Sequence, residues 1–370
     1  MKRSSTLKYL AIFIGLVLFT FALTACGGGS EEPGTSEGSN ENGVVDMTVA
    51  FLGQIDAWPT YAAIQDGSDE KYGLDIEMMF FDSGMPMIET VPAKQWQLAD
   101  AGSVPSLMAS LRYDVEMIGI ASDESPANAV MARPDNPVFN TQGANPDFPE
   151  AYGTADDVRG KTFLVTTVSS AHYTLSKYLE SLGLSDKDVT INNLEQAQAV
   201  KAFESGEGDF IVLWTPFMYR GFEKGWKTVA DASQCGATTL MMFLAEKDFA
   251  AENPDLVAQF LAVNNDKTKR YLNEGVSLVP EIQTYFKDWA AMDITESDVK
   301  LDIETHKLYT LEEQIEMMES GELEASLADA AKFFVDQSLF TQDEFDQLVG
   351  KSFGINPEYL KAALEITPAE

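Results

Sequence analysis

The sequence predicts an α/β protein of two lobes, each a mostly parallel sheet flanked by helices, with a helical C-terminal extension. Three observations predict it. The chain has 370 residues, 45% of them hydrophobic, which suits two lobes of roughly 150 residues better than one small domain. Short β-prone runs alternate with helix-compatible stretches in two series. A proline-rich segment, which no helix or central strand accepts, separates the two series.

The N-terminus reads as a secretory signal followed by a tether. Three basic residues precede an apolar run at 9–22, and small residues lead to Cys26. The run is shorter than the about 20 apolar residues that a spanning helix needs. The sequence therefore predicts a signal peptide at 1–25. Residues 26–46 are rich in Gly, Ser, Glu and Asn, so we expect a flexible tether there.

The stretch before Cys26 resembles the lipobox of bacterial lipoproteins. The resemblance implies that Cys26 becomes the first mature residue and carries a lipid on its sulfur. The chain would then be held outside the cytoplasm at the cell membrane by that lipid anchor.

The first series of strands and helices begins directly after the tether. Short β-prone runs are each followed by a small or polar loop and then by a helix-compatible stretch. The expected elements are a strand at 47–52, a helix at 58–65, a strand at 74–81, a helix opening at 85–86, a strand at 97–101, a helix from about 105 to 111 and a strand at 115–120.

The second series follows a long surface loop at 133–153, which contains four prolines. Its expected elements are a strand at 162–166, a helix at 171–182, a strand at 189–192, a helix at 195–204, a strand at 209–213 and a return strand at 239–244. We therefore expect lobe 2 to span 122–250, and lobe 1 to consist of 47–121 and 251–370.

The tail after the return strand changes to amphipathic helix. Asn253, Pro254 and Asp255 form a helix start, with Asn as the cap, Pro in the first turn and an acid near the positive end of the helix dipole. Mostly amphipathic helix is expected from there to about residue 348.

Composition excludes several classes of function. The 25 Lys and Arg against 59 Asp and Glu give a net charge of −34, which opposes binding to nucleic acid phosphates. Two Cys and two His are too few for a Cys/His zinc centre or a disulfide framework. We expect no cofactor and no metal, although a metal site made of carboxylates alone stays possible.

Open α/β sheets bind ligands at the carboxyl ends of their strands. Two such sheets would face each other across a cleft that closes on a small solute. The candidate binding residues at these strand ends are Gln54, Asp56, Trp58, Asp82, Ser83, Gly102, Ser103, Asp123, Glu124, Thr167, Ser169, Ser170, His172 and Trp214.

Several of these residues have two interpretations. Ser169 and Ser170 start a helix, so their hydroxyls and the free N–H groups of its first turn could hold an anionic head group, or Ser169 could merely cap the helix. His172 could donate to the same anion or be a packed histidine. Trp58 and Trp214 could form an aromatic wall for a ligand or belong to the core.

The acids bear on the charge of the ligand. If two of Asp56, Asp82, Asp123 and Glu124 converge, they favour an ammonium group, because a carboxylate repels an anion in a closed cleft. Any single one of them could instead be exposed to solvent. Taurine carries both signs and would reconcile a helix-end anion site with nearby acids. His306 is interpreted as an ordinary helix residue.

Several segments resemble the solute-binding proteins of the nitrate, sulfonate, taurine and bicarbonate importers. They are the second-lobe entry at 157–173, the early strand and loop at 48–58, the segment 208–216 and the helix opening at 253–257. The resemblance implies a type 2 periplasmic-binding-protein-like fold, and an ABC permease with its ATPase as partners. The loop 133–153 and the acids Asp123 and Glu124 depart from that group and leave the ligand open.

The leading hypothesis is a monomeric, lipid-anchored receptor, not an enzyme, that captures a small sulfonate- or taurine-like solute for an ABC importer. One alternative is a receptor for a cationic amine on the same fold. A second is an enzyme similar to the thiamine-pyrimidine synthases, for which only His172 and Cys235 are present in the relevant half. A third is a surface sensor or adhesin that lacks a transporter.

Overall fold

Two β-sheets organise the part of the chain that the structure describes. The structure is a computed structural model, and it describes residues 44–369. The predicted signal peptide, the lipidation site Cys26 and the tether up to residue 43 lie outside the described residues. The last tether positions, Val45 and Asp46, already belong to the first strand.

The first sheet has the strand order β11-β4-β10-β3-β1-β2. Strand β1 runs parallel to β2 and β3, β10 lies antiparallel between β3 and β4, and β11 is antiparallel to β4. The strands are β1 Val45–Phe51, β2 Leu74–Phe80, β3 Leu98–Gly102, β4 Val115–Asp123, β10 Leu240–Glu246 and β11 Lys307–Leu308. We call this sheet with its surrounding helices lobe 1.

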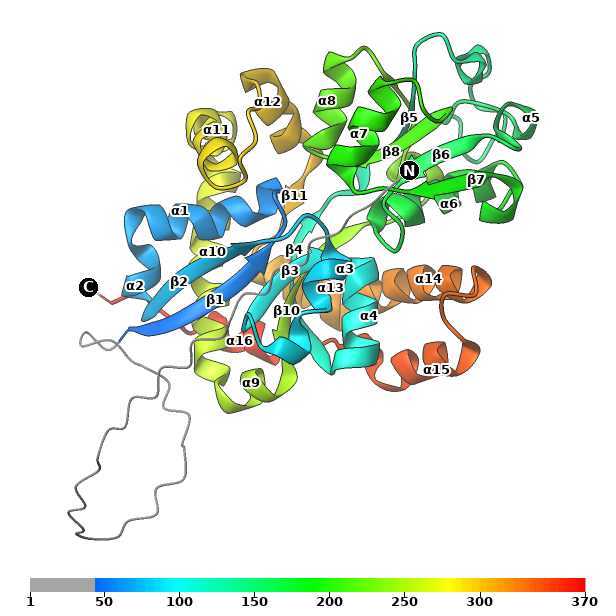
Figure 1. Ribbon diagram of the computed structural model, residues 1–370. Helices are drawn as coiled ribbons and strands as arrows, with labels where there is room; N and C mark the ends of the chain where they lie inside the picture. Colours follow the sequence, from blue (N-terminus) through cyan, green and yellow to red (C-terminus); the bar gives the residue numbers. More distant parts are fainter. Residues whose placement is uncertain (1–43, 370) are drawn as a thin grey trace, which may run out of the picture. The chain divides into compact units, whose positions relative to one another are not determined.

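The second sheet has the strand order β7-β6-β8-β5-β9. Strand β6 is parallel to β7 and β8, and β5 lies antiparallel between β8 and β9. The strands are β5 Asn128–Ala132, β6 Thr162–Val165, β7 Thr190–Asn193, β8 Phe210–Trp214 and β9 Lys227–Asp231. We call this sheet with its helices lobe 2; it is the green region of Figure 1.

The α/β fold class is confirmed, with mixed rather than purely parallel pairing. In each sheet four strands share one direction, β1 to β4 in lobe 1 and β6 to β9 in lobe 2, and β10 and β5 run against them. The sequence did not predict β5 or β9 as strands. Although β10 falls within the range expected for lobe 2, it pairs with β3 and β4 of lobe 1.

Alternating side chains of lobe 2 pack on two helix layers. On one face Phe163 and Val165 of β6 lie in a core with α6, and on the other face Leu164 lies in a core with α7. Because successive residues of a strand point to opposite faces, the continuous apolar runs of these strands fit a sheet covered on both sides. The helices of this lobe are α5 Ala155–Val158, α6 Ser170–Ser181, α7 Gln196–Glu204 and α8 Phe217–Glu223.

The helices around lobe 1 include the predicted C-terminal extension, drawn from yellow to red in Figure 1. The early helices are α1 Trp58–Asp66, α2 Ser68–Lys71, α3 Gly84–Ile88 and α4 Ser103–Tyr113. The later ones are α9 Lys247–Glu252, α10 Pro254–Glu274, α11 Val279–Asp288, α12 Glu296–Thr305, α13 Leu311–Ser320, α14 Glu322–Asp336, α15 Gln342–Gly350 and α16 Glu358–Ala363. Among the described residues, no helix combines the length and the apolar character needed to cross a bilayer.

The start of α10 differs from the prediction in one detail. Pro254 stands in the first turn as expected, but the Asn253 side chain does not cap this helix. Its amide donates instead to the carbonyl of Phe249 in α9, at 3.1 Å. The preceding helix α9 ends at Glu252, and the Asn253 side chain hydrogen-bonds to the last turn of that helix.

Two crossings connect the lobes, one at residues 124–127 after β4 and one at 232–239 before β10. Hydrogen bonds join the two crossings. The N–H of Glu124 donates to the carbonyl of Thr239 at 2.9 Å, and the N–H of Thr239 donates to Ser125 Oγ at 3.0 Å. The crossings therefore lie side by side, as a hinge requires.

Candidate functional site

A small cavity lies between the lobes at the carboxyl ends of their strands. Its volume is about 20 Å³, which is room for about one water. Both lobes line it, with Leu52, Gln54, Gly84, Gly102, Pro105 and Met241 from lobe 1, Ser169, Ser170 and Trp214 from lobe 2, and Glu124 from the first crossing. We call it the interlobe cavity. So small a volume means that the two lobes lie almost in contact at this point.

Six of the predicted binding residues meet at the interlobe cavity. They are Gln54, Gly102, Glu124, Ser169, Ser170 and Trp214. They come from five separate segments of the chain, so only the fold brings them together. Trp214 is 5% exposed. Its backbone N–H donates to the side-chain oxygen of Gln196 at 3.2 Å, which fixes its position.

Glu124 is the acid of this cavity, and its two carboxylate oxygens differ. Gln54 donates its side-chain N–H to Oε2 at 2.8 Å, and Gln54 is itself positioned by Tyr285, whose hydroxyl donates to its carbonyl at 2.6 Å. Oε1 is buried and has no hydrogen-bond partner within residues 44–369. Burial raises the pKa of Glu124, because a charged carboxylate loses hydration there.

Gly102 makes room where the lobes meet. A Cβ built on it would stand 2.7 Å from Ser170 Oγ, and 3.9 Å from both Glu124 Oε1 and Met241 Sδ. The first distance is too short for any real side chain, so only glycine permits this approach of lobe 2 to β3. The absence of a side chain at Gly102 therefore lets Ser170 of lobe 2 lie close to the end of β3.

The turn between β6 and α6 presents the start of a helix to the cavity. Val168 adopts a left-handed conformation with φ of 56°, which is uncommon for a β-branched residue and marks strain that surrounding contacts must hold. Ser169 then caps the helix: its Oγ accepts from the N–H of His172 at 3.4 Å and donates to the carbonyl of Thr166 at 2.6 Å. The N–H groups of Ser170 and Ala171, in the first turn of α6, have no acceptor within the helix, as at any helix start.

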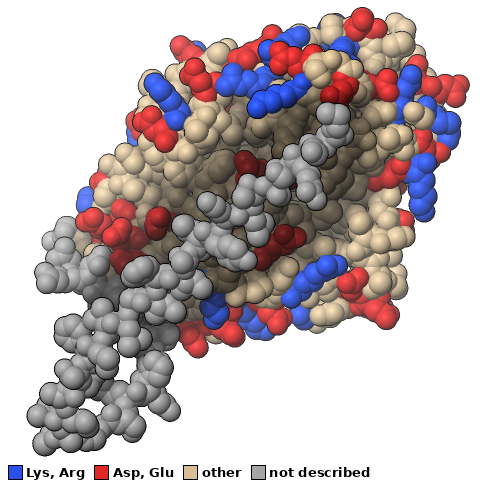
Figure 2. All heavy atoms as spheres, viewed as in Figure 1, with Lys and Arg blue, Asp and Glu red and all other residues tan. Residues whose placement is uncertain are grey.

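A wider groove of about 250 Å³ opens beside the cavity, between α3 and the same turn. Ser83, Thr167 and Ser169 among the predicted residues line it, together with the acids Glu89 and Glu195. The Thr167 N–H is already taken by Asn193, at 3.0 Å. On the face shown in Figure 2, Lys and Arg alternate with Asp and Glu along the rim, and acidic side chains are visible inside the hollowed middle.

Four predicted residues lie away from the cavity and the groove. Asp82 is exposed. Asp123 is the last residue of β4, and its carboxylate accepts from the N–H and the hydroxyl of Ser125 at 2.8 and 2.6 Å. Ser103 is buried at the start of α4. His172 uses both ring nitrogens within lobe 2, with Asp186 at 2.8 Å and the N–H of Val168 at 3.3 Å, so it packs rather than faces the cavity.

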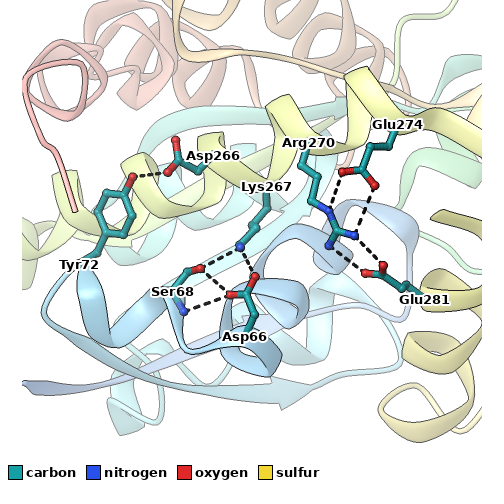
Figure 3. A network of polar contacts seen from close by, with 8 residues as sticks. All are labelled: Asp66, Ser68, Tyr72, Asp266, Lys267, Arg270, Glu274 and Glu281. Carbon is teal, nitrogen blue, oxygen red and sulfur yellow. Dashed lines mark hydrogen bonds and ion pairs between the residues drawn. The ribbon is translucent and has the colours of Figure 1, made fainter. Parts of the chain in front are cut away.

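Trp58 belongs to the core of lobe 1. It is 1% exposed, lies 6.0 Å from the ring of Tyr271, and has the guanidinium of Arg270 over its ring. A cavity of about 390 Å³ between α1, α10 and α11 borders this tryptophan, but only lobe 1 lines it. The charge of Arg270 is already paired there with Glu274 and Glu281 (Figure 3).

The same view shows how α10 is fastened to α1 and α2. Lys267 donates to Asp66 at 2.5 Å and to Ser68 at 2.8 Å, and Tyr72 donates to Asp266 (Figure 3). These contacts hold the first helix of the C-terminal extension on lobe 1. This polar network therefore stabilises the packing of α10 on lobe 1 and does not line the interlobe cavity.

Asp56 is buried next to a second acid that sequence reasoning missed. Asp100 on β3 is 1% exposed, and neither of its carboxylate oxygens has a donor in the described chain. Burial, and then the neighbouring Asp56, raises the pKa of Asp100 well above its ordinary value; burial also raises that of Asp56. The alternation of β3 could have indicated Asp100, since it shares a strand face with Gly102 two residues later.

His306 is not the ordinary helix residue that the sequence predicted. It is 3% exposed at the end of α12, where its Nδ1 lies 3.1 Å from Asp302 and its Nε2 lies 3.3 Å from Thr215 Oγ1 of lobe 2. Tyr219 of lobe 2 also donates to Asp302, at 2.5 Å. Helix α12 therefore links the extension to lobe 2 through buried polar groups.

Comparison with known proteins places the chain in a family. The model of the family described as NMT1/THI5 like matches residues 54–274, more than half of the chain. The chain belongs to the NMT1/THI5-like family. Relatives that the chain resembles are named as binding proteins. A Brachyspira hyodysenteriae protein, provisionally named an ABC transporter periplasmic binding protein, is 24% identical over 340 residues, covering 91% of this chain and 94% of its own.

Other relatives have the same type of name and fold. The taurine-binding periplasmic protein of Escherichia coli is 24% identical over 298 residues, covering 79% of this chain and 87% of its own. The aliphatic sulphonate binding protein SsuA of the same organism has a TM-score of 0.63 at 17% identity, over 82% of this chain and 96% of its own. The nitrate-binding protein NrtA from Synechocystis has a TM-score of 0.69 at 11% identity, over 87% and 89%. The periplasmic-binding-protein-like fold predicted from the sequence is confirmed.

Proposed function

We propose that this protein is the extracytoplasmic solute-binding lipoprotein of an ABC importer, and that it captures a small sulfonate- or taurine-like solute in the interlobe cavity. The observation that carries the proposal is the cavity itself, which residues of both lobes and of the first crossing line. A ligand there contacts both lobes at once, so its binding energy favours the closed arrangement.

Two helix starts support recognition of an anionic head group. Gly102 and Pro105 at the start of α4, and Ser169 and Ser170 at the start of α6, all line the cavity. The free N–H groups and the dipole of a helix start both attract negative charge. The names of the taurine- and sulfonate-binding relatives agree with such a head group.

We infer that the protein binds its solute without converting it. An enzyme similar to the thiamine-pyrimidine synthases would depend on Cys235 and His172, and the surroundings of both residues disfavour catalysis. Cys235 is 1% exposed, its thiol donates to the carbonyl of Asp231, and burial raises its pKa, which disfavours a reactive thiolate. His172 is engaged with Asp186. Neither is placed as a nucleophile or as its base.

The solute is tested by thermal unfolding of the chain from residue 26 onward, made with Cys26→Ala so that no lipid attaches. Sulfonates, taurine, carboxylates, nitrate and amines are added one at a time. A ligand at a hundred times its Kd stabilises the folded state by about 2.7 kcal/mol, so one chemical class should raise the melting temperature. The absence of any response across the set would contradict a receptor for small solutes.

The lipid anchor is tested in cells that express the full chain. Wild-type protein should sediment with membranes, and Cys26→Ala should release it from them, because one covalent lipid is the expected attachment. Cys235→Ala is the matched control, since it removes the other thiol and should leave the protein on the membrane. Retention of the Cys26→Ala protein on membranes would contradict lipid anchoring.

A further inference from the structure

The contact between α12 and lobe 2 adjoins a wall of the interlobe cavity. Thr215 of lobe 2 follows Trp214, which lines the cavity. The N–H of Thr215 donates to the carbonyl of Ala127 in the first crossing at 3.0 Å, and its Oγ1 lies 3.3 Å from Nε2 of His306. Thr215 is therefore held between the first crossing and α12, and the position of Trp214 depends on both contacts.

His306 joins the two lobes through both of its ring nitrogens. Nδ1 lies 3.1 Å from Asp302 on the same helix, and Nε2 faces Thr215 of lobe 2. A protonated imidazole carries two N–H donors, so it can donate to both of these oxygen atoms at once. Lobe 2 also engages Asp302 directly, since Tyr219 donates to it at 2.5 Å. The protonated form of His306 therefore fits the arrangement in which lobe 2 lies against α12.

The titratable groups around His306 and its partner are acids and tyrosines. They are Asp302 on α12, Asp56 before α1, Asp100 on β3, Glu124 in the first crossing, Tyr219 on α8, Tyr271 on α10 and Tyr285 on α11. Lys307, the next residue in the chain, is exposed and pairs with Glu313. Burial alone would lower the pKa of His306, but Asp302, followed by Asp56 and Glu124, raises it to about 9.

Separation of the lobes would remove part of these surroundings. Thr215 and Tyr219 belong to lobe 2, so water would take their places. The pair of His306 and Asp302 would remain on α12, but water screens an exposed ion pair and makes it weak. His306 would then bind its proton less tightly than with the lobes together. Because linkage is reciprocal, proton binding and the approach of the lobes favour one another.

We propose that His306 is a positioning residue for solute binding, and that its proton holds lobe 2 against the C-terminal extension, so that the protonated chain binds its solute more tightly. The inference rests on the proposed function, because it requires a solute bound between the lobes. His306 does not line the interlobe cavity and acts through Thr215, the neighbour of the cavity wall at Trp214.

The first test needs no solute. The sequence contains two histidines, so isotope-labelled imidazole rings in the lipid-free chain give two NMR signals, which His172→Gln assigns. The signal of His306 should titrate with a pKa well above 6.5. Thr215→Val removes the oxygen that lobe 2 offers to Nε2 and should lower this pKa, because a buried N–H without an acceptor disfavours the charged ring. An equal pKa in the wild type and in Thr215→Val would overturn the coupling to lobe 2.

The second test follows solute affinity with pH. The probe is 1-propanesulfonate, because its charge stays constant over the range. Isothermal titration of the wild-type chain should show an affinity about tenfold weaker at about pH 10 than at about pH 7, which is the change that one pKa unit of difference between separated and closed lobes produces. His306→Gln has no such proton to lose, so its affinity should change much less.

His172→Gln is the matched control. It removes the other histidine, which is engaged with Asp186 within lobe 2, and should keep the pH dependence of the wild type. Thermal unfolding of each ligand-free variant at both pH values shows whether it is folded. The NMR titration of the wild type and of Thr215→Val stands even if His306→Gln does not fold.

The outcomes separate this inference from the proposed function. The same pH dependence in the wild type and in His306→Gln overturns the role of His306 and leaves a sulfonate receptor intact. Tighter binding by the wild type at the higher pH does the same. If 1-propanesulfonate does not bind at either pH, the sulfonate-like solute fails, and the NMR titration alone decides whether lobe 2 controls the proton of His306.

Discussion

Two contacts between the C-terminal extension and lobe 2 each contain a hydrogen bond from a tyrosine to an aspartate. The aspartate is buried in one contact and half exposed in the other. In the α12 contact, Tyr219 donates to Asp302, whose side chain is fully buried beside His306. In the α14 contact, Tyr173 donates to Asp329, whose side chain is 52% exposed and also pairs with Lys177. The comparison teaches that the type of bond does not set its energy; the loss of solvent around the carboxylate does.

The largest effect is expected from removing the charge of the buried acid. Asp302→Asn leaves a buried histidine without its counter-ion, and breaking one partner of a buried pair costs about 3–5 kcal/mol of unfolding free energy. Asp329→Asn makes the same change at the exposed contact and should cost about 1 kcal/mol or less. Urea denaturation of the two variants measures both values.

Equal losses in the two variants would break the comparison. A large loss in Asp329→Asn would mean that the α14 contact is shielded from water in solution. A small loss in Asp302→Asn would mean that His306 is neutral in the folded protein or that water reaches it.

A change of pH is expected to have a smaller effect on the unfolding free energy. It tests the two contacts separately, because of these two only the α12 contact contains a histidine. Burial alone would lower the pKa of His306, but Asp302, with Asp56 and Glu124 further away, raises it from 6.5 to about 9. The folded state then binds the proton more tightly than the unfolded chain. Its contribution, up to about 3 kcal/mol, is complete below the unfolded pKa and is lost as pH rises through about 9.

The measurement is urea denaturation of the wild type and of His306→Gln between about pH 6 and pH 10. The difference between the two unfolding free energies should shrink as pH rises, because the wild type loses its protonated histidine and the variant has none. Other titrating groups contribute to both chains and largely cancel. A difference that is constant with pH would show that His306 does not titrate in this range.

Local sequence signals predicted the β6–α6 turn well. A β-branched strand, a polar loop and an apolar stripe at helical spacing gave the strand, the turn and the helix, and Ser169 caps as one interpretation expected. The same signals placed Gln54, Gly102 and Glu124 at strand ends, where the fold brings them to one cavity. Their role in binding a solute stays a prediction.

The features that the sequence could not predict depend on contacts between distant segments of the chain. His306 follows an amphipathic helix and looks unremarkable in its own neighbourhood, but its partner Thr215 is 91 positions away. For Trp58 the sequence could not decide between a wall for the ligand and core packing, because the choice depends on Tyr271 of α10, against which its ring lies. Strand β5 was not predicted, because five residues are too short to reveal a period.

Two adjacent connections between lobes are typical of a hinge, about which one lobe rotates relative to the other. The crossings at 124–127 and 232–239 have this arrangement. The α12 contact is a further link to lobe 2, in which Tyr219 and Thr215 of lobe 2 meet Asp302 and His306 of the extension. Separation of the lobes at this place would have to break the hydrogen bonds that Tyr219 and Thr215 make with Asp302 and His306. Deprotonation of His306 at high pH would remove its charge pairing with Asp302 and so weaken the α12 contact.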